Sequence, residues 1–429
     1  MANTFNFGNG EWARKTGEVL AYNSENDNYK PLPFTFDRAS SATRVNKEGL
    51  IETVDVDEPR IDFLNNSKGH LLLEPESTNR TSNSEQPSTW HSSNGMTITA
   101  NATTSPDGTS NASLAVRNAS SGGIYTRNRF IFTTETGTQT VTGSYFVKYY
   151  NNQWVRLESI FFTGSPANSK CSFFDIQNGV LGTVDATHTA KIENYGSGWY
   201  RCSITFDIDK DSDTSGHIGY IQLEPMISDD TNTFAAIGQG YYAYGSQGEE
   251  LSYPTSYIPT SGSAVTRSAD TCKQENLPSA SIPSAYPFTV FCDFEVPKTG
   301  QKTFAFSFAD ISSSARYFTF GYDIEGNNKM RFENRANGVI YGANSNSTYE
   351  GGRHKVAVKF ISSTNFKGFV NGLEVVNYTH TASPFNSNIN DVLLGQLRVL
   401  SDTGDRAPIH QFMIFNEALT DTELIALTS

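Results

Sequence analysis

Apolar and polar residues alternate with a period of two in the most regular segments of this 429-residue chain. In PFTVFCDFEV, one face of a strand would carry Phe288, Val290, Cys292, Phe294 and Val296. In HKVAVKF, the two valines and Phe360 would share one face, and the two lysines would lie on the other. Successive side chains of a strand point to opposite faces, so this alternation indicates half-buried antiparallel strands. The chain is therefore predicted to be all-β.

Turn signals and one helix signal complete this pattern. Asn371 and Gly372 in GFVNGLEVV can adopt the positive φ angles of a type I′ turn, which predicts a hairpin. Near the C-terminus, Thr420 is followed by Glu423 at the spacing of a capping box. The sequence therefore predicts one short C-terminal helix in an otherwise all-β protein.

The composition divides the chain into four parts. Residues 1–72 are irregular and charged, and they are predicted to form an N-terminal anchoring arm. Residues 73–267 and 286–429 are rich in alternating segments, and each is predicted to form a β-sandwich domain. Residues 268–285 are polar and contain prolines, which favours a linker.

The charge and hydropathy of the chain argue against several classes of partner. A formal net charge of −13 disfavours nucleic acid and anionic membranes, because both bind basic faces. No apolar run reaches the length of about 18 residues that spans a bilayer, and the N-terminus lacks the pattern of a signal peptide. We therefore expect no nucleic-acid partner and no membrane insertion.

The cysteines give no indication of a metal site or another cofactor. They lack CxxC spacing, so zinc is not expected. Cys202 lies on an apolar strand face and is predicted to be a buried free thiol. A Cys171–Cys202 or Cys272–Cys292 disulfide is the alternative.

Two groups of carboxylates are candidates for metal binding or catalysis. DIDKDSDTSG begins like a calcium loop, but Ser212 and Ile218 stand where an EF-hand carries Gly and Glu, so an acidic hairpin loop is predicted. Asp293 and Glu295 share a strand face at a spacing compatible with glycosidases, but that face is predicted to point to solvent. The chain has no nucleophile elbow and no phosphate loop, so no catalytic residue is predicted.

Arginines alternate with carboxylates in FTFDRASSATRVNKEGLIETV (34–54) and in the residues that follow it. Arg–carboxylate pairs can be bidentate and can fix the register of short strands. Leu32, Phe34 and Phe36 would share one strand face, which could lie against another surface. Structural ion pairs are predicted at Arg38, Arg44, Arg60 and Asp62, with Asp37, Glu52 and Glu74 as further carboxylates.

Several strings resemble a segment common to virion proteins of tailed bacteriophages, which recurs in head fibres, tail fibres and tail spikes. The first string is FTFDRASSATRVNKEGLIE, followed by PRIDF and LLLEPESTNR. The later strings, in the same order as in that family, are NGVLGTV, IENYGSGWYRCSITF, IQLEP and YPTSYIPTSGSAVTRSAD. The resemblance implies that residues 73–267 form a jelly roll similar to carbohydrate-binding modules.

The C-terminal block resembles a second family. GFVNGLEVV together with IHQFMIFNEALTDTELIAL is similar to the end of laminin-G or concanavalin-like sandwich domains. In that family a hairpin precedes a closing strand and a short helix. The resemblance implies a lectin-like sandwich for residues 286–429.

Exposed aromatic residues are candidates for stacking against sugars, whose C–H groups pack on ring faces. Tyr150 and Trp154, in YFVKYYNNQWVRLE, would lie around a polar turn and are the predicted carbohydrate-binding residues. Trp90 and Tyr125 are further candidates. The alternative is that these rings belong to the core or to a subunit interface.

The resemblance implies a non-enzymatic virion protein, a fibre or decoration on head or tail, that attaches to bacterial surface glycans. Its expected partners are capsid or tail proteins, further copies of the chain in a homotrimer, and the glycans. Its expected location is the virion, after assembly in the host cytoplasm and release by lysis. One alternative is a tail spike that cleaves capsule as a glycosidase. Another is a structural protein that stabilises the capsid and binds no glycan.

Overall fold

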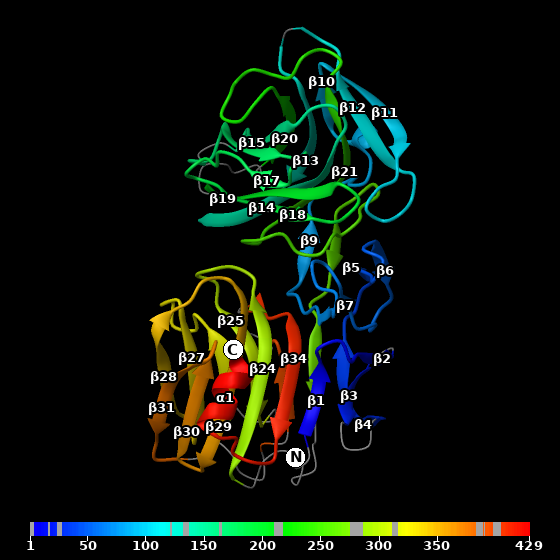
Figure 1. Cartoon of the computed structure of the whole chain (residues 1–429). Coiled ribbons are helices and arrows are strands. Elements are labelled where there is room, and N and C mark those ends of the chain that lie inside the picture. The colour runs from blue at the N-terminus through cyan, green and yellow to red at the C-terminus, as the bar shows by residue number, and fades with distance from the viewer. Residues whose placement is uncertain are drawn as a thin grey trace. The chain divides into compact units, whose positions relative to one another are not determined.

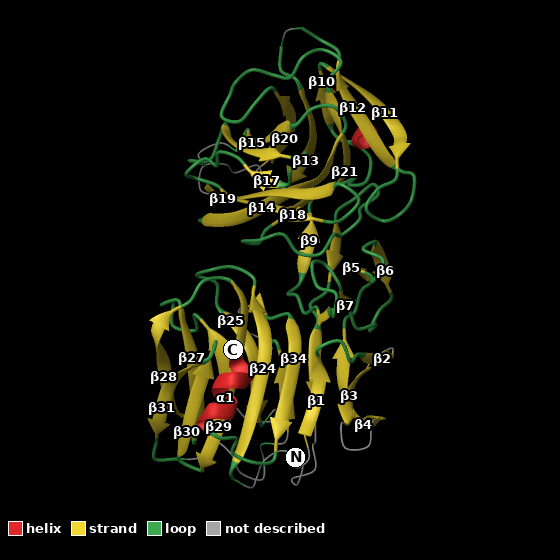
Figure 2. Ribbon diagram, viewed as in Figure 1, coloured by secondary structure: helices red, strands yellow, loops and turns green. Residues whose placement is uncertain are grey.

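The computed structural model describes residues 4–15, 18–23, 28–120, 122–131, 137–162, 165–209, 218–274, 286–310, 316–382, 389, 391–397 and 405–429. In this part of the chain the regular elements are strands, one 3₁₀ turn, η1 (Pro87–Thr89), and one α-helix, α1 (Asp421–Thr428) (Figures 1 and 2). The predicted all-β class with a single short C-terminal helix is confirmed. None of the helices described is long and apolar enough to cross a membrane.

The chain forms two compact units that are each assembled from separate stretches of sequence. The terminal unit contains Met1–Ser41, Val54–Pro75 and Ser268–Ser429. The central unit contains Ala42–Thr53 and Glu76–Arg267. Each unit has its own hydrophobic core.

The terminal unit is a β-sandwich built from two rows of strands (Figure 2). One row contains, in order, β31 (Leu373–Thr379), β30 (Asn365–Val370), β29 (Gly352–Ser362), β24 (Phe288–Val296), β34 (Ile409–Phe415), β1 (Thr4–Gly8) and β3 (Glu18–Asn23). The other row contains, in order, β28 (Val339–Thr348), β27 (Lys329–Ala336), β26 (Tyr317–Tyr322), β25 (Thr303–Ala309), β32 (Asp391–Leu394), β23 (Thr271–Gln274) and β4 (Asn28–Asp37). Pairing of β3 with β4 joins the two rows. The short strands β2 (Ala13–Lys15), β7 (Ile61–Asp62), β8 (His70–Leu71) and β33 (Asp405–Arg406) pair at the margins.

Aromatic rings from the two rows pack against each other in the core of the terminal unit. The ring centroids of Phe294 and Phe320 are 5.6 Å apart, and those of Phe318 and Phe360 are 4.8 Å apart. Phe34 and Phe36 of β4 are fully buried in the same core. Because full burial of a Phe contributes roughly 1.5–3 kcal/mol, β4 is an integral part of this sandwich.

The compact units share the predicted boundary after residue 267, and their boundary after Pro75 lies close to the predicted residue 72. The predicted arm and linker do not stand apart, however: residues 42–53 belong to the central unit, and the rest of residues 1–75 joins residues 268–429 in the terminal unit. β1 pairs with β34 from Thr4↔Phe415 to Gly8↔Gln411, so strands of the predicted arm complete the C-terminal sandwich. β23 lies in the predicted linker and pairs with both β4 and β32. The physical reason is that these strands obtain their stability from partners distant in sequence, which local composition does not reveal.

Phe34 and Phe36 were predicted to share a strand face with Leu32, and both are buried. The side chain of Leu32 lies outside the described residues.

The predicted cap and hairpin both form in the terminal unit. The Glu423 amide donates to Thr420 Oγ1 at 3.3 Å, and the Thr420 amide donates to Glu423 Oε2 at 2.7 Å. Asn371 and Gly372 have φ angles of 48° and 80°, as a type I′ turn requires, and they connect β30 to β31. These local patterns were sufficient because each is satisfied within a few residues of sequence.

The central unit contains two six-stranded antiparallel sheets and two small ribbons. One sheet has the order β10 (Ser92–Asn94), β13 (Tyr125–Ile131), β20 (Ile218–Met226), β15 (Trp154–Ile160), β16 (Lys170–Asp175) and β17 (Val180–Leu181). The other has the order β11 (Met96–Thr103), β12 (Ala112–Arg117), β21 (Gly240–Glu249), β14 (Thr138–Tyr149), β19 (Trp199–Asp209) and β18 (Thr189–Asn194). β5 (Ala42–Val45) pairs with β6 (Ile51–Val54), and β9 (Ser77–Asn79) pairs with β22 (Val265–Arg267).

The core of the central unit contains Trp90 and Cys202. The ring of Trp90 lies 4.9 Å from that of Tyr145, so Trp90 is a core residue and not an exposed platform. Cys202 is fully buried, and all four cysteines of the chain are free, which confirms the predicted thiol. Burial raises the pKa of the Cys171 thiol to about 12, so this partly exposed cysteine is a weak nucleophile.

His188 makes the central unit sensitive to acid. Its ring nitrogens lie 3.0 Å from Ser159 Oγ and 2.9 Å from Ser172 Oγ, and burial lowers its pKa to about 4. The unfolded chain therefore binds more protons than the folded chain between pH 6.5 and 4, and stability falls as the pH falls through this window. We expect a loss on the order of 2–3 kcal/mol by pH 4, measured by denaturant unfolding. A His188→Gln variant should lose less across the same window, and an unchanged pH slope would contradict the assignment.

Candidate functional site

One face of the first sheet of the central unit carries polar and aromatic side chains. Across the strands, Ser92, Arg127, Gln222, Glu158 and Cys171 are directly opposite one another in register. Thr126, the neighbour of Arg127 on the same strand, points into the core, where its hydroxyl lies 2.9 Å from the Tyr241 hydroxyl. Successive side chains of a strand point to opposite faces. The row therefore lies on the face that points away from the core.

Arg127 is held between two tyrosine rings on this face. Its guanidinium carbon lies 4.1 Å from the ring centroid of Tyr220 and 4.6 Å from that of Tyr125. Its Nε donates to Ser92 Oγ and its Nη1 donates to Gln222 Oε1, both at 2.9 Å. Cation–π contacts and two hydrogen bonds thus fix the position of the side chain.

Phe161 extends this group of rings into solvent. Its ring packs edge-on against Tyr220 at 5.8 Å and lies 5.6 Å from the Arg127 guanidinium carbon. The side chain is 55 % exposed, and the residue has a φ of 65°. A bulky residue in the left-handed region costs about 1–3 kcal/mol, and burial does not offset that cost here. Such a combination points to a role in binding.

His91 and Arg129 complete the group. His91 Nε2 lies 3.2 Å from the Tyr220 hydroxyl, and Arg129 lies opposite Tyr220 in the strand register. The pKa of His91 is lowered, first by burial and then by the positive charges of Arg127 and Arg129. We call the group the Arg127 face; its residues are His91, Tyr125, Arg127, Arg129, Phe161 and Tyr220.

A pair of carboxylates lies farther along the same sheet. Arg156 Nε donates to Glu224 Oε2 at 2.5 Å, and Arg156 Nη2 lies 3.9 Å from Glu158 Oε2. Burial raises the pKa of Glu224 to about 7, although Arg156 acts in the opposite direction. Such a pKa suits a general acid, but Glu224 is only 2 % exposed and is held by Arg156. The geometry therefore favours a structural role for this pair.

The predicted carbohydrate-binding residues Tyr150 and Trp154 lie in different places. Tyr150 follows β14, is 42 % exposed and packs edge-on against Tyr242 at 5.4 Å. Trp154 begins β15 and is partly buried. Within the described residues the two rings make no contact with each other. The structure does not bring them into one platform, and their role in binding stays a prediction.

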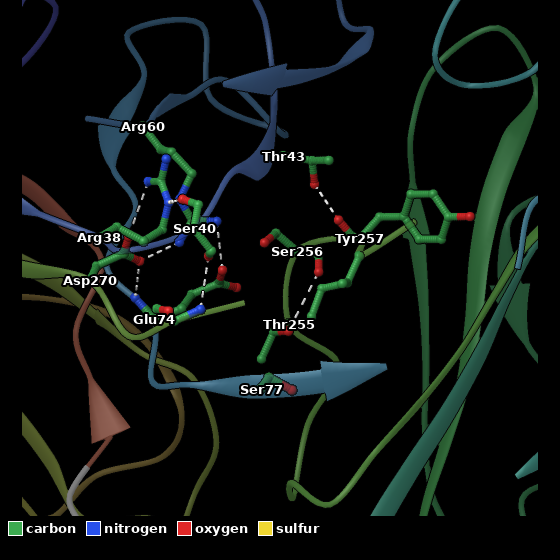
Figure 3. A network of polar contacts seen from close by, with 12 residues as sticks. Arg38, Ser40, Thr43, Arg60, Glu74, Ser77, Thr255, Ser256, Tyr257 and Asp270 are labelled. Atoms are coloured by element: carbon green, nitrogen blue, oxygen red, sulfur yellow. Dashed lines mark hydrogen bonds and ion pairs between the residues drawn. The ribbon is translucent and has the colours of Figure 1, made fainter. Parts of the chain in front are cut away.

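The predicted ion-pair residues Arg38 and Arg60 meet inside the terminal unit (Figure 3). Arg60 Nη1 donates to Glu74 Oε2 at 2.7 Å, and its Nη2 donates to Asp270. Arg38 Nη1 donates to Asp270 Oδ1 at 3.3 Å. Burial acts to lower the pKa of Arg60, but Asp270 and Glu74 hold it above its ordinary value. All four side chains are buried, so this is a closed network and not a ligand site.

The other two predicted ion-pair residues have different surroundings. Arg44 Nη2 lies 2.6 Å from Glu52 Oε1 between the neighbouring strands β5 and β6 of the central unit. Asp62 Oδ1 accepts a hydrogen bond from the Leu64 amide at 2.8 Å. The predicted ion pair of Arg44 is therefore present, and an ion pair of Asp62 stays a prediction.

The carboxylates that were candidates for catalysis or metal binding do not form an open site in the described part of the chain. Asp293 was expected to point to solvent, but it is 3 % exposed and binds Arg353 through two hydrogen bonds of 2.7 Å. The difference arises because Arg353 of the neighbouring strand covers it. Asp207 Oδ1 accepts from Thr140 Oγ1 at 2.6 Å, while residues 210–217 of the acidic loop lie outside the described residues. In the described part of the chain no group of three His, Cys, Asp or Glu side chains could hold a metal ion.

Of the residues of the Arg127 face, Tyr125 was a candidate from the sequence and the others were not. The alternation in YTRNRF and GYIQLEP could have placed Tyr125, Arg127, Arg129, Tyr220 and Gln222 on one face. Phe161 carried no such signal, because it stands beside Phe162, which is buried.

Residues 270–425 match the family model of the concanavalin A-like lectin/glucanases superfamily, of the laminin G type. The predicted concanavalin-like nature of the C-terminal block is therefore confirmed for this range. No curated protein matches the chain.

Among solved structures, the chain is similar to the CBM40 of the Ruminococcus gnavus IT-sialidase, with 18 % identity, a TM-score of 0.31, and coverage of 35 % of this chain and 87 % of that one. Domain 4 of AbnA, a GH43 arabinanase from Geobacillus stearothermophilus, matches with 15 % identity and a TM-score of 0.31, over 38 % of this chain and 73 % of that one. The K499G mutant of NanB sialidase from Streptococcus pneumoniae matches with 19 % identity and a TM-score of 0.29, over 34 % of this chain and 25 % of that one.

Proposed function

We propose that this chain is a non-enzymatic structural protein of a tailed-bacteriophage virion and that it binds bacterial surface glycans through the Arg127 face. The observation that carries the binding proposal is Phe161, which is 55 % exposed in a strained conformation beside the Tyr125–Arg127–Tyr220 stack. The ordered strings of residues 34–270 support the virion assignment. The lectin-type match of residues 270–425 supports attachment to sugars.

The chemistry of the Arg127 face suits a sugar. A pyranose ring presents C–H groups on one side, which pack on aromatic faces, and hydroxyls around its edge, which need polar partners. Phe161 and Tyr220 supply the rings, and His91 supplies an exposed polar group beside them. The fixed position of Arg127 reduces the entropy lost on binding.

We expect Phe161→Gly to weaken glycan binding about tenfold, because one stacking ring is worth about 1 kcal/mol or more. The free energy of unfolding should stay within about 1 kcal/mol, since glycine adopts a positive φ without strain. The measurement is titration of the full chain with glycans selected on an array of bacterial oligosaccharides. Ile237→Ala, which removes another exposed apolar side chain, is the matched control. Unchanged binding in Phe161→Gly would contradict the proposed site. A Trp154→Ala variant in the same assay tests the separate prediction that Trp154 binds carbohydrate.

The virion assignment is tested on particles. Gold-labelled antibodies against the chain should mark the head or tail of purified phage, and light scattering tests the expected homotrimer. Absence of the chain from purified particles would overturn this part of the proposal.

The two alternatives make different predictions. A depolymerase would release new reducing ends from capsular polysaccharide. We expect no such release, because Glu224, the carboxylate whose pKa would suit a general acid, is held by Arg156. A purely capsid-stabilising protein would leave particle binding to host cells unchanged in the Phe161→Gly variant, whereas we expect weaker attachment.

A further inference from the structure

Among the residues that the structure describes, Arg129 has no acidic partner on the Arg127 face. It lies two residues from Arg127 on β13, so both side chains are on the same side of the sheet. Its Nε is buried and has no hydrogen-bond acceptor, and no carboxylate among the described residues pairs with its guanidinium. Arginines elsewhere in the chain do have such partners, as Arg353 has Asp293 and Arg156 has Glu224.

Arg127 likewise pairs with no carboxylate in the described part of the chain. Its two hydrogen bonds go to neutral oxygens, those of Ser92 and Gln222, and its Nη2 has no acceptor within the described residues. Alternate residues of a strand have Cα atoms about 7 Å apart, and two unit charges at such a separation repel each other by roughly 2 kcal/mol near a protein surface. Burial is the main cause of the lowered pKa of His91, and the positive charges of Arg127 and Arg129 lower this pKa further. In a chain of net charge −13, this pair is a local excess of positive charge.

We propose that the Arg127 face binds an acidic sugar residue, with the sugar carboxylate on Arg129 and the Nη2 edge of Arg127 and the sugar ring on Phe161 and Tyr220. The inference rests on the proposed glycan-binding function and names its ligand class. A guanidinium matches a carboxylate through two parallel hydrogen bonds, which a neutral sugar hydroxyl does not reproduce. A sugar that bears a carboxylate therefore satisfies both the charges and the rings.

Nucleic acid also combines negative charge with stacking groups. The net charge of −13 disfavours nucleic acid, because a long polyanion is repelled by the negative charge of the whole chain. A single acidic sugar residue interacts mainly with the positive charges beside it. Phosphate-bearing glycans share the negative charge but present a tetrahedral group. Both are included as arms of the test.

The test uses the full chain and a panel of uronic-acid-containing bacterial polysaccharides, each paired with its carboxyl-reduced form, in which the acid has become a neutral alcohol. We expect the reduced form to bind about 10–100-fold more weakly than the acidic form, the range typical of a charge-assisted pair. Arg129→Gln should weaken binding of the acidic form by a similar factor and leave the reduced form unaffected. Arg129→Lys should restore part of the affinity.

Lys191→Gln is the matched control, because it removes a positive charge from β18 in the other sheet, where Lys191 pairs with Glu193. It should leave the affinity unchanged, and all variants should retain the unfolding midpoint of the natural chain. Equal binding of acidic and reduced forms, or an unaltered preference in Arg129→Gln, would overturn the acidic-sugar inference while glycan binding stands. Stronger binding to phosphorylated glycans or to single-stranded oligonucleotides would overturn it as well. No binding to any glycan would overturn the proposed function itself.

Discussion

A fragment of residues 286–429 is expected to remain unfolded or to aggregate, whereas the full chain unfolds cooperatively. The fragment lacks β1, which pairs with β34 over five residues, and it lacks β23 and β4, which extend the row beside β32. It also lacks Phe34 and Phe36, both fully buried. Truncation of one core Phe costs about 3–5 kcal/mol, and a domain has only about 5–15 kcal/mol in total, so the remaining strands cannot hold the fold. Far-UV circular dichroism and urea unfolding of the purified fragment measure this.

The control keeps every strand of the terminal unit. A chain in which a flexible linker replaces residues 76–267 and joins residues 1–75 to residues 268–429 should unfold in one cooperative transition. If residues 286–429 alone show the same transition, the N-terminal strands are an accessory to the sandwich and not part of it.

The sequence was a good guide to features that are satisfied locally. Alternation at 288–296 and 354–360 corresponds to β24 and β29, and the Asn371-Gly372 turn and the Thr420 cap form as expected. In each case the pattern and its structural cause lie within one element. The boundary after residue 267 was also predicted, but the predicted arm and linker proved to be parts of a sandwich. β1 and β23 depend on strands far away in the chain, and a short strand carries too little pattern to reveal its partner.

The buried ion-pair network and the candidate site both depend on residues that lie far apart in the sequence. Arg38 and Arg60 were identified as ion-pair residues, but their common partner Asp270 lies 232 and 210 residues away. On the central unit, an alternating strand indicates that Arg127 and Arg129 share a face, but not whether neighbouring strands supply carboxylates or rings. Phe161 and Phe162 have the same side chain and opposite exposures, which only the turn after β15 determines.

Asp270→Asn is expected to destabilise the terminal unit by about 3–5 kcal/mol, because it removes the carboxylate that two buried guanidinium groups share. Arg38 and Arg60 are within 1 % of full burial, so water cannot replace the lost carboxylate. The measurement is hydrogen exchange of the β24 and β29 amides in the full chain, which reports the opening free energy of the terminal unit. The matched control is Glu52→Gln, which breaks the Arg44 pair at a site where the glutamate side chain is 36 % exposed and should cost less than about 1 kcal/mol. Equal losses in the two variants would mean that burial does not govern these pairs, and a loss below about 1 kcal/mol in Asp270→Asn would show that the charge of Asp270 is not needed to hold the two arginines.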